Sequence, residues 1–310
     1  MKKHFLILLA VAFMGIAALA PDEPGDKVEL GRQLFFDPIL SKDKTISCAS
    51  CHKPAFAFAD TMAFSRGVHG RLGARNTPSA MNLSLQSVFF WDGRAGSLEE
   101  QALAPIENPV EMDLPIDQAL HRLQRSRYRK YFKRLFNREV TRADLGAAIA
   151  AYERSLETSN SPFDNWKFLA DARAVSDSVK RGFVVFNTKG KCIKCHFGGD
   201  FTQGEFKNIG LFDGKILHDS GRAVITGNRQ DLGKFKVPGL RNVAVTAPYM
   251  HNGQFRTLRE VIDFYNDPDQ VVPHAVSRDS VLARPLGLTE RDKMDLEAFL
   301  MSLTDRRFIR

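Results

Sequence analysis

The stretches Cys48-Ala49-Ser50-Cys51-His52 and Cys192-Ile193-Lys194-Cys195-His196 are two copies of one pattern, and together they use all four cysteines of the chain. The pattern C-x-x-C-H is the attachment signature of c-type haem, in which both thiols bond to the porphyrin and the histidine binds the iron. Zinc sites and redox dithiols also use C-x-x-C pairs, but neither needs a histidine directly after each pair. The sequence therefore predicts two covalently attached haems, with His52 and His196 as iron ligands.

The beginning of the chain has the pattern of an export signal. Lys2 and Lys3 precede an apolar run from Phe5 to Ala20, which ends in the small-residue cleavage pattern Ala18-Leu19-Ala20. The run is short for a helix that spans a bilayer, so a retained membrane anchor is the weaker alternative. We predict a signal peptide over residues 1–20 and a periplasmic protein that does not span the membrane once the signal is removed.

Length and composition limit the class of protein. The chain has 310 residues, of which 44% are hydrophobic and 26% charged, so it can bury more than one core and is too apolar for a disordered chain. The net charge of +8 comes from Lys and Arg residues that are scattered among acids. Because they form no basic block, we expect a solvated surface and no nucleic-acid partner.

Similar apolar stretches precede the two haem motifs. Leu30–Phe36 lies ahead of the first motif and Arg181–Phe186 ahead of the second, and both are typical of short amphipathic helices. Turn-forming residues at Ser159–Pro162 mark the best boundary between the two copies. We predict an N-terminal haem domain over residues 21–160 and a C-terminal haem domain over residues 161–310.

Helical spacing of apolar residues also predicts helices over Thr141–Glu157 and Thr289–Leu303, each with a Thr-x-x-Asp capping pattern at its start. No long stretch alternates in the manner of a β-strand, so we expect no sizeable sheet. The loops Pro54–Met81 and Gly198–Tyr249 are long and glycine-rich, which is typical of segments that wrap a ligand. The predicted fold class is mainly α: two cytochrome c-like haem domains packed together, with long irregular loops.

Further motifs occur in a fixed order along the chain. They are Phe90-Trp91-Asp92-Gly93-Arg94, Gln101, Pro105, Asn108-Pro109-Val110-Glu111-Met112 and Pro248-Tyr249-Met250-His251-Asn252-Gly253. In order and spacing they resemble the motifs of the bacterial dihaem cytochrome c peroxidase family, which includes the MauG-type enzymes, and the resemblance covers nearly all of the mature chain. It implies an N-terminal haem at which peroxide reacts and a C-terminal haem that stores or relays electrons.

The resemblance implies roles for residues of the N-terminal half. It makes Glu111 the acid and base near peroxide, with Gln101 and Pro105 lining the same pocket. Breaking the O–O bond requires a proton on the leaving oxygen, and a partly buried carboxyl with a raised pKa can deliver it. Trp91 corresponds to the tryptophan between the haems, where an indole can pass an electron. The alternatives are a solvated loop carboxylate for Glu111 and ordinary core packing for Trp91.

The second ligand of the C-terminal haem separates the subfamilies. Typical peroxidases of the family place a methionine after the Pro-Tyr motif, whereas MauG-type enzymes place a tyrosine there. No methionine occurs here between Met250 and Met294, so the resemblance makes Tyr265 the candidate ligand, with a plain core aromatic as the alternative. A phenolate is a hard, anionic ligand that lowers the potential of the iron, in contrast to a thioether.

Two further positions, His69 and Gly190, bear on how the protein works. His69 lies in a glycine-rich loop near the place where many family peroxidases carry a displaceable histidine ligand for the N-terminal haem, and both ligation and its absence are open. Gly190 stands where MauG carries a surface tryptophan that draws electrons from its protein substrate. This departure argues against a protein-modifying role.

The resemblance also suggests a calcium ion between the domains. The Asn76 side chain and the main-chain carbonyls of Thr246 and Pro248 would hold it, with water completing the oxygen shell. The alternative for the segment around Asn76 is a plain turn.

Three functions are weighed on these grounds. The main one is a peroxidase that reduces hydrogen peroxide to water with electrons from a small exported cytochrome c or copper protein. Lysines flank the second haem motif and either steer an acidic donor or form a solvated basic loop: Lys189, Lys191 and Lys194. The alternatives are a MauG-like enzyme that oxidises a partner protein, and a non-enzymatic dihaem electron carrier. A homodimer is left open.

Overall fold

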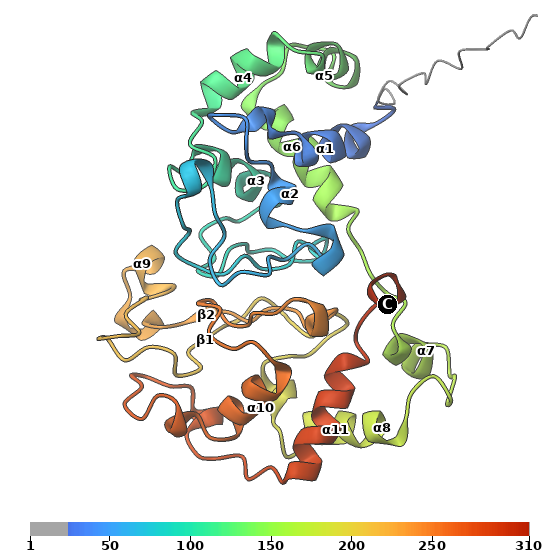
Figure 1. Ribbon diagram of the computed structural model, residues 1–310, viewed down its shortest axis with the longest axis vertical. Helices are drawn as coiled ribbons and strands as arrows, with labels where there is room; N and C mark the ends of the chain where they lie inside the picture. Colours follow the sequence, from blue (N-terminus) through green and yellow to red (C-terminus); the bar gives the residue numbers. More distant parts are fainter. Residues whose placement is uncertain (1–23, 310) are drawn as a thin grey trace, which may run out of the picture.

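The computed structural model describes residues 24–309, so the predicted signal peptide over residues 1–20 lies outside the described part of the chain. Figure 1 shows two halves stacked along the long axis, with the N-terminal half above and the C-terminal half below. Long loops of both halves face each other across the middle. No helix within the described residues has the length and apolar character needed to cross a membrane.

Six helices form the scaffold of the described N-terminal half. They are α1 (Lys27–Phe36), α2 (Cys48–Cys51), α3 (Leu98–Glu107), α4 (Ile116–Gln124), α5 (Tyr128–Phe136) and α6 (Arg142–Arg154). Helix α1 packs across α6, and α3 packs on another face of α6. The contact with α1 is close because Gly31 has no side chain: a Cβ there would lie 1.9 Å from the carbonyl oxygen of Ala148. Around this crossing lies the core of the half, with Leu30, Phe35 and Ile149 fully buried.

The C-terminal half repeats this crossing. Its helices and strands are α7 (Pro162–Phe168), α8 (Asp177–Asn187), β1 (Phe206–Lys207), α9 (Ala223–Thr226), β2 (Phe235–Lys236), α10 (Leu258–Asn266) and α11 (Glu290–Met301). Helix α8 packs along α11, and a Cβ on Gly182 would lie 1.9 Å from the Asp295 carbonyl oxygen. Strands β1 and β2 form a two-residue antiparallel pair. The matching glycines show that each haem motif follows a helix held in the same kind of close contact.

The helices begin where the sequence predicts. Thr141 with Asp144 and Thr289 with Asp292 form reciprocal capping boxes at the starts of α6 and α11. The two amphipathic stretches ahead of the haem motifs are α1 and α8, and the only sheet in residues 24–309 is the short pair β1–β2. The prediction of a mainly helical fold without a sizeable sheet is therefore confirmed.

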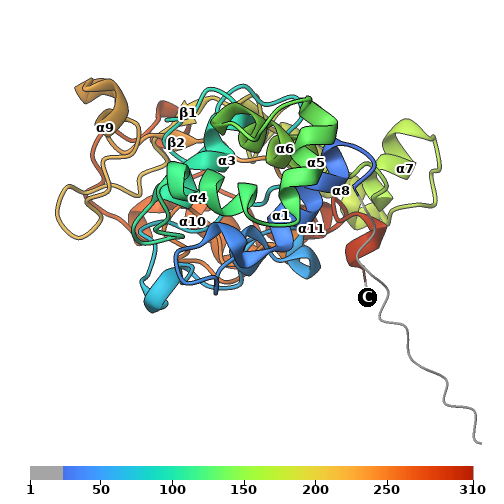
Figure 2. The ribbon, with the colours of Figure 1, turned by 90° about the horizontal axis from the view of Figure 1, so that it is seen from above.

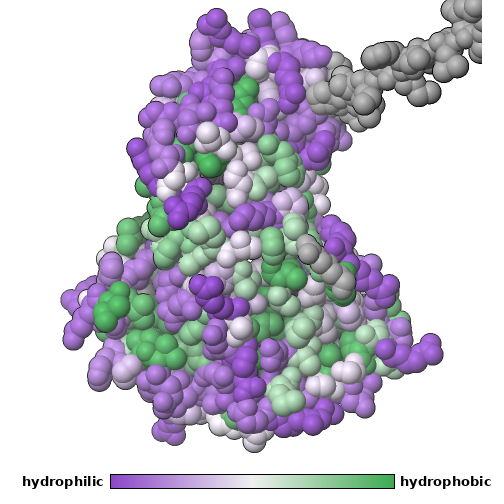
Figure 3. Space-filling view, in the orientation of Figure 1, coloured by the Kyte–Doolittle hydropathy of each residue, from purple (hydrophilic) through white to green (hydrophobic). Residues whose placement is uncertain are grey.

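Charged residues join the two halves. Arg75 of the N-terminal half donates to both carboxylate oxygens of Asp219 in the C-terminal half, at 2.7 and 2.8 Å, and also to Asp92 at 2.5 Å. At the other side of the molecule the C-terminal segment returns to the linker, where the Arg306 N–H donates to the Asn160 carbonyl at 3.0 Å. Figure 1 shows α4 and α5 at the outer end of the N-terminal half, away from this interface, and Figure 2 looks onto that end from above. Their surface is mostly hydrophilic (Figure 3).

Candidate functional site

A single cavity of about 1010 Å³ runs between the two halves and is lined by both C-x-x-C-H motifs. The first motif forms α2, and the second forms a short 3-10 turn at Cys192–Lys194. All four thiols are unpaired and partly buried. The long interdomain loops supply much of the remaining wall, as the glycine-rich loops of the sequence lead one to expect.

The two histidines are held in the orientation that iron ligation needs. The Nδ1 atom of His52 donates to the Phe58 carbonyl at 2.9 Å, and that of His196 donates to the Phe201 carbonyl at 3.0 Å. Each bond leaves Nε2 as the ring nitrogen for a metal, which is the usual arrangement around a ligating histidine. Burial lowers the pKa of both imidazoles, that of His196 to about 4, so they are neutral. Cavity, thiols and histidines therefore fit two c-type haems.

Glu111 lies in the cavity wall together with Gln101 and Pro105. Gln101 and Pro105 are one turn apart on α3, and because Pro105 has no N–H, the Gln101 carbonyl lacks its usual helical partner. Glu111 follows in the next loop, where its Oε1 accepts from the Asn108 side chain at 2.6 Å. Burial raises the pKa of Glu111, against the smaller opposite effects of Asn108 and Arg94. The carboxyl can therefore hold or release a proton inside the cavity.

His69 does not reach this cavity. Its backbone has φ of 58°, its side chain is 53% exposed, and its Nδ1 lies 3.7 Å from the Asp43 carboxylate. The loop itself is tied to the catalytic candidate, because the Val68 N–H donates to the Glu111 carbonyl at 2.8 Å. In this structure the loop holds the backbone of Glu111 while the imidazole of His69 points to the surface.

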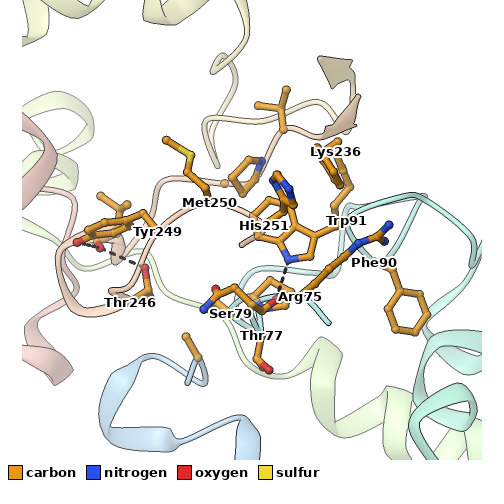
Figure 4. A pocket seen from close by; sticks show the side chains of 18 of the residues that line it. Arg75, Thr77, Ser79, Phe90, Trp91, Lys236, Thr246, Tyr249, Met250 and His251 are labelled. Carbon is orange, nitrogen blue, oxygen red and sulfur yellow. Dashed lines mark hydrogen bonds between the residues drawn. The ribbon is translucent and has the colours of Figure 1, made fainter. Parts of the chain in front are cut away.

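Trp91 lies at the junction of the two halves, as Figure 4 shows. Its indole N–H donates to the Asn76 carbonyl at 2.8 Å within the N-terminal half, and its own carbonyl accepts from the Lys236 N–H of the C-terminal half at 2.7 Å. The side chain lines the same cavity as both haem motifs. Trp91 is therefore hydrogen-bonded to both halves at the wall of the shared cavity.

Tyr265 is on α10 and lines the cavity in the C-terminal half. Its hydroxyl has no hydrogen-bond partner among the described residues, and burial, reinforced by the nearby Cys195 and Cys192 thiols, raises its pKa. Tyr265 is partly buried, and a hydroxyl that lines a cavity without a protein partner is the environment expected of a group that meets a ligand.

Asn76, Thr246 and Pro248 also line the cavity. The amide nitrogen of Asn76 donates to the Met62 carbonyl at 3.1 Å, which leaves its Oδ1 as a free oxygen. The carbonyls of Thr246 and Pro248 accept no main-chain hydrogen bond within residues 24–309. Three oxygen donors are thus available near the interface.

Lys236 and Glu153 also line the cavity and were not predicted as site residues from the sequence. Lys236 is partly buried and has no carboxylate partner among the described residues. Its ammonium donates to the Gln86 side chain at 2.6 Å and the Val88 carbonyl at 3.1 Å, and removal from solvent lowers its pKa to about 8. No pattern in the sequence marks it. The second of these residues is Glu153. The sequence could have indicated its burial, because it lies four residues after Ile149 and hence on the apolar face of α6.

Two haem-attachment motifs on one shared cavity define a dihaem c-type protein, and comparison with known proteins identifies its family. The family model of the di-haem cytochrome c peroxidases matches residues 25–172. The methylamine utilization protein MauG of Methylorubrum extorquens is 37% identical over 90% of this chain and 78% of its own length. The cytochrome c551 peroxidase of Nitrosomonas europaea is 38% identical over 80% of this chain and 75% of its own length. The chain belongs to the di-haem cytochrome c peroxidase family.

Solved structures agree with this assignment. A MauG-like protein associated with microbial copper homeostasis superposes with a TM-score of 0.81 at 33% identity, covering 93% of this chain and 92% of that one. The predicted fold class, family and oxidoreductase class are confirmed, and so is the prediction of two haems.

Proposed function

We propose that this protein reduces hydrogen peroxide to water at the haem of the N-terminal half, with electrons that enter through the haem of the C-terminal half. The observation that carries the proposal is the position of Glu111: a carboxyl with a burial-raised pKa in the wall of the cavity that holds Cys48, Cys51 and His52. The names of its relatives, among them cytochrome c peroxidases, support the same chemistry.

Residues of the N-terminal half have separate roles in this reaction. The bound haem supplies the iron that binds peroxide and exchanges electrons with it. Glu111 would take a proton from peroxide and return one to its leaving oxygen, which is the role of a positioned general acid and base. Gln101 and Pro105 line the same wall, whereas His69, whose side chain is at the surface, does not line the cavity.

Electron transfer between the halves would pass Trp91. Its indole is fixed to Asn76, and its backbone is fixed to Lys236 across the interface. We assign residues 21–160 to the peroxidatic domain and residues 161–310 to the electron-transfer domain, with Tyr265 as the second ligand of the C-terminal haem. The proposal also includes a calcium ion at Asn76, Thr246 and Pro248, whose oxygens suit this hard cation.

The electron donor would be a small exported cytochrome c or copper protein that docks at the second haem motif, in the periplasm. Lys191, directly before this motif, and Lys194, within it, are exposed, whereas the ammonium of Lys189 is paired with Asp292 at 2.6 Å. Two exposed cations at the second haem motif favour an acidic partner.

Steady-state consumption of hydrogen peroxide by the matured protein with a reduced cytochrome c tests the function. We expect consumption that depends on the donor, and its absence contradicts the proposal. A mass increase in a co-purifying protein, lost in Trp91→Phe, would instead indicate oxidation of a partner protein. Against that outcome, Gly190 has no room for a large side chain, because a Cβ there would lie 2.9 Å from the Val185 carbonyl. A reduced protein inert to both peroxide and carbon monoxide would indicate an electron carrier.

A further inference from the structure

Glu153 is a buried carboxyl for which the mechanism above has no use. It lies on the last turn of α6, is only 5% exposed, and lines the cavity of the haem motifs. Its Oε2 atom has no hydrogen-bond partner within the described residues. A buried polar atom without a partner destabilises a fold, so packing alone would favour an apolar residue of similar size here.

The position of Glu153 within the cavity is on the side of the first haem motif. Its carboxyl is close enough to the Cys48 thiol to raise the pKa of that thiol, as the carboxyl of Glu111 also does. Glu153 has no such effect on the pKa of the Cys192 and Cys195 thiols of the second motif. Glu111 and Glu153 are therefore two carboxyls that border the N-terminal part of the cavity, one from the loop after α3 and the other from α6.

Its surroundings keep Glu153 protonated near neutral pH. Burial raises its pKa to about 8, and the nearby Glu99 carboxylate adds to this rise. Arg154 opposes it, but its guanidinium is bonded to both carboxylate oxygens of Glu99 at 2.7 and 2.8 Å. This Glu99–Arg154 pair is partly exposed, so a charged pair in contact with solvent lies close enough to act on Glu153, which itself lines the cavity.

We propose that Glu153 is a second proton-carrying carboxyl of the N-terminal haem cavity, which passes protons from the solvent side of α6 to oxygen atoms bound in the cavity. The inference rests on the proposed peroxidase function. Reduction of H₂O₂ by two electrons from the donor breaks one O–O bond and consumes two protons to form two waters. Glu111 redistributes protons at the reacting oxygens, and Glu153 gives up its acid proton, becomes a carboxylate and is reprotonated from solvent water.

The test compares Glu153→Gln, which keeps the shape but has no acid proton, with Glu107→Gln. Glu107 is an exposed glutamate of α3, paired with Arg142 at 3.1 Å, and serves as the matched control. In the matured protein, the infrared difference spectrum between oxidised and reduced haem should contain the carbonyl band of a protonated carboxylic acid. The band should be lost in Glu153→Gln and kept in Glu107→Gln.

Kinetics give the second readout. Peroxide consumption by the pre-reduced protein should fall about 100-fold in Glu153→Gln at pH 7, the lower end of what a positioned acid contributes. In the unmodified protein the rate should decrease as the pH rises through about 8, and the variant should lack this decrease. Glu153→Asp, which keeps the acid, should retain the band and the decrease, and it replaces Glu153→Gln as the informative variant if the latter does not mature.

The outcomes are distinct. A Glu153→Gln protein with the rate, pH profile and infrared spectrum of the unmodified protein overturns the proposal. If Glu153→Gln does not mature, a Glu153→Asp protein without the band or the pH dependence overturns it. If the unmodified protein does not consume peroxide, the peroxidase function fails, and the infrared band alone decides whether Glu153 holds a proton in the cavity.

Discussion

The main-chain carbonyl of Trp91 accepts a hydrogen bond from the main-chain N–H of Lys236 at 2.7 Å, across the boundary between the two halves of the molecule. The same residue uses its indole N–H to bond Asn76 within its own half at 2.8 Å (Figure 4). Trp91 is thus fixed to both haem-binding halves through two different groups, and only one of these depends on the side chain.

Trp91→Phe separates the two attachments. The backbone bond to Lys236 should persist, while loss of the indole bond leaves the Asn76 carbonyl unpaired and should lower the free energy of unfolding by about 1 kcal/mol. Peroxide should then oxidise the C-terminal haem more slowly in the variant, and stopped-flow spectra of the pre-reduced protein measure this rate. An unchanged rate would show that electrons pass between the halves without the indole.

Glu111→Gln tests the acid and base of the cavity. We expect donor-dependent peroxide consumption to fall by about 10²- to 10⁴-fold, because the amide cannot exchange a proton. The absorption spectra of both haems should stay as in the unmodified protein. Glu107→Gln should keep full activity, and equal losses in both variants would remove Glu111 from its proposed role.

Tyr265→Phe tests the ligand of the C-terminal haem. Removal of the hydroxyl should abolish or shift the low-spin signal of this haem in the oxidised spectrum, and should raise its reduction potential, since an anionic oxygen ligand favours the oxidised iron. Paired oxidised and reduced spectra of the variant and the unmodified protein measure both effects. Identical spectra would contradict the assignment.

Substitution of the glycine at the α1–α6 crossing and of the glycine at the α8–α11 crossing should destabilise the protein to a similar extent. Gly31→Ala and Gly182→Ala each bring a methyl group to 1.9 Å from a carbonyl oxygen of the facing helix, so each should destabilise the protein by about 1–3 kcal/mol through overpacking. Gly25→Ala and Gly199→Ala should be nearly neutral, because a Cβ at either position would have no heavy atom within 4 Å apart from its chain neighbours. Denaturant unfolding of the haem-loaded variants distinguishes the two pairs, and a neutral Gly31→Ala would mean that α1 and α6 can separate.

Asp295 should make stability depend on acid pH. It is 3% exposed, and the Arg181 guanidinium, bonded to it at 2.7 and 2.9 Å, holds its pKa well below the usual value. Because the folded-state pKa is the lower one, the stabilisation is complete above the unfolded-state pKa of about 4 and is lost as the pH falls below it. Asp295→Asn should cost about 2 kcal/mol at pH 7 and remove this acid-side loss.

Thermal unfolding between pH 2 and pH 7 measures the effect of Asp295. Asp177→Asn is the control, because the Asp177 side chain is 85% exposed and its pairing with Lys180 is of the weak surface kind. A pH profile of Asp295→Asn that parallels the unmodified protein would show that other carboxyls cause the acid sensitivity.

The sequence by itself determined the two haems and the helical scaffold. A C-x-x-C-H motif is a local chemical unit, because attachment needs only two thiols and a histidine at fixed spacing along the chain. The capping pairs Thr141–Asp144 and Thr289–Asp292 are local in the same way, since a helix start is satisfied by a side chain three residues away. Such features can be predicted without knowledge of how the halves pack.

Only the tertiary structure decided which side chains meet at the cavity. His69, a ligand candidate by its place in the sequence, is held at the surface beside Asp43, whereas Glu153, an ordinary residue of a helix, is buried in the cavity wall. Burial and proximity depend on segments far apart in the sequence, and a shift of one residue on a helix turns a side chain by about 100°. The proton-holding character of Glu153 and the fixed position of Trp91 therefore follow from packing.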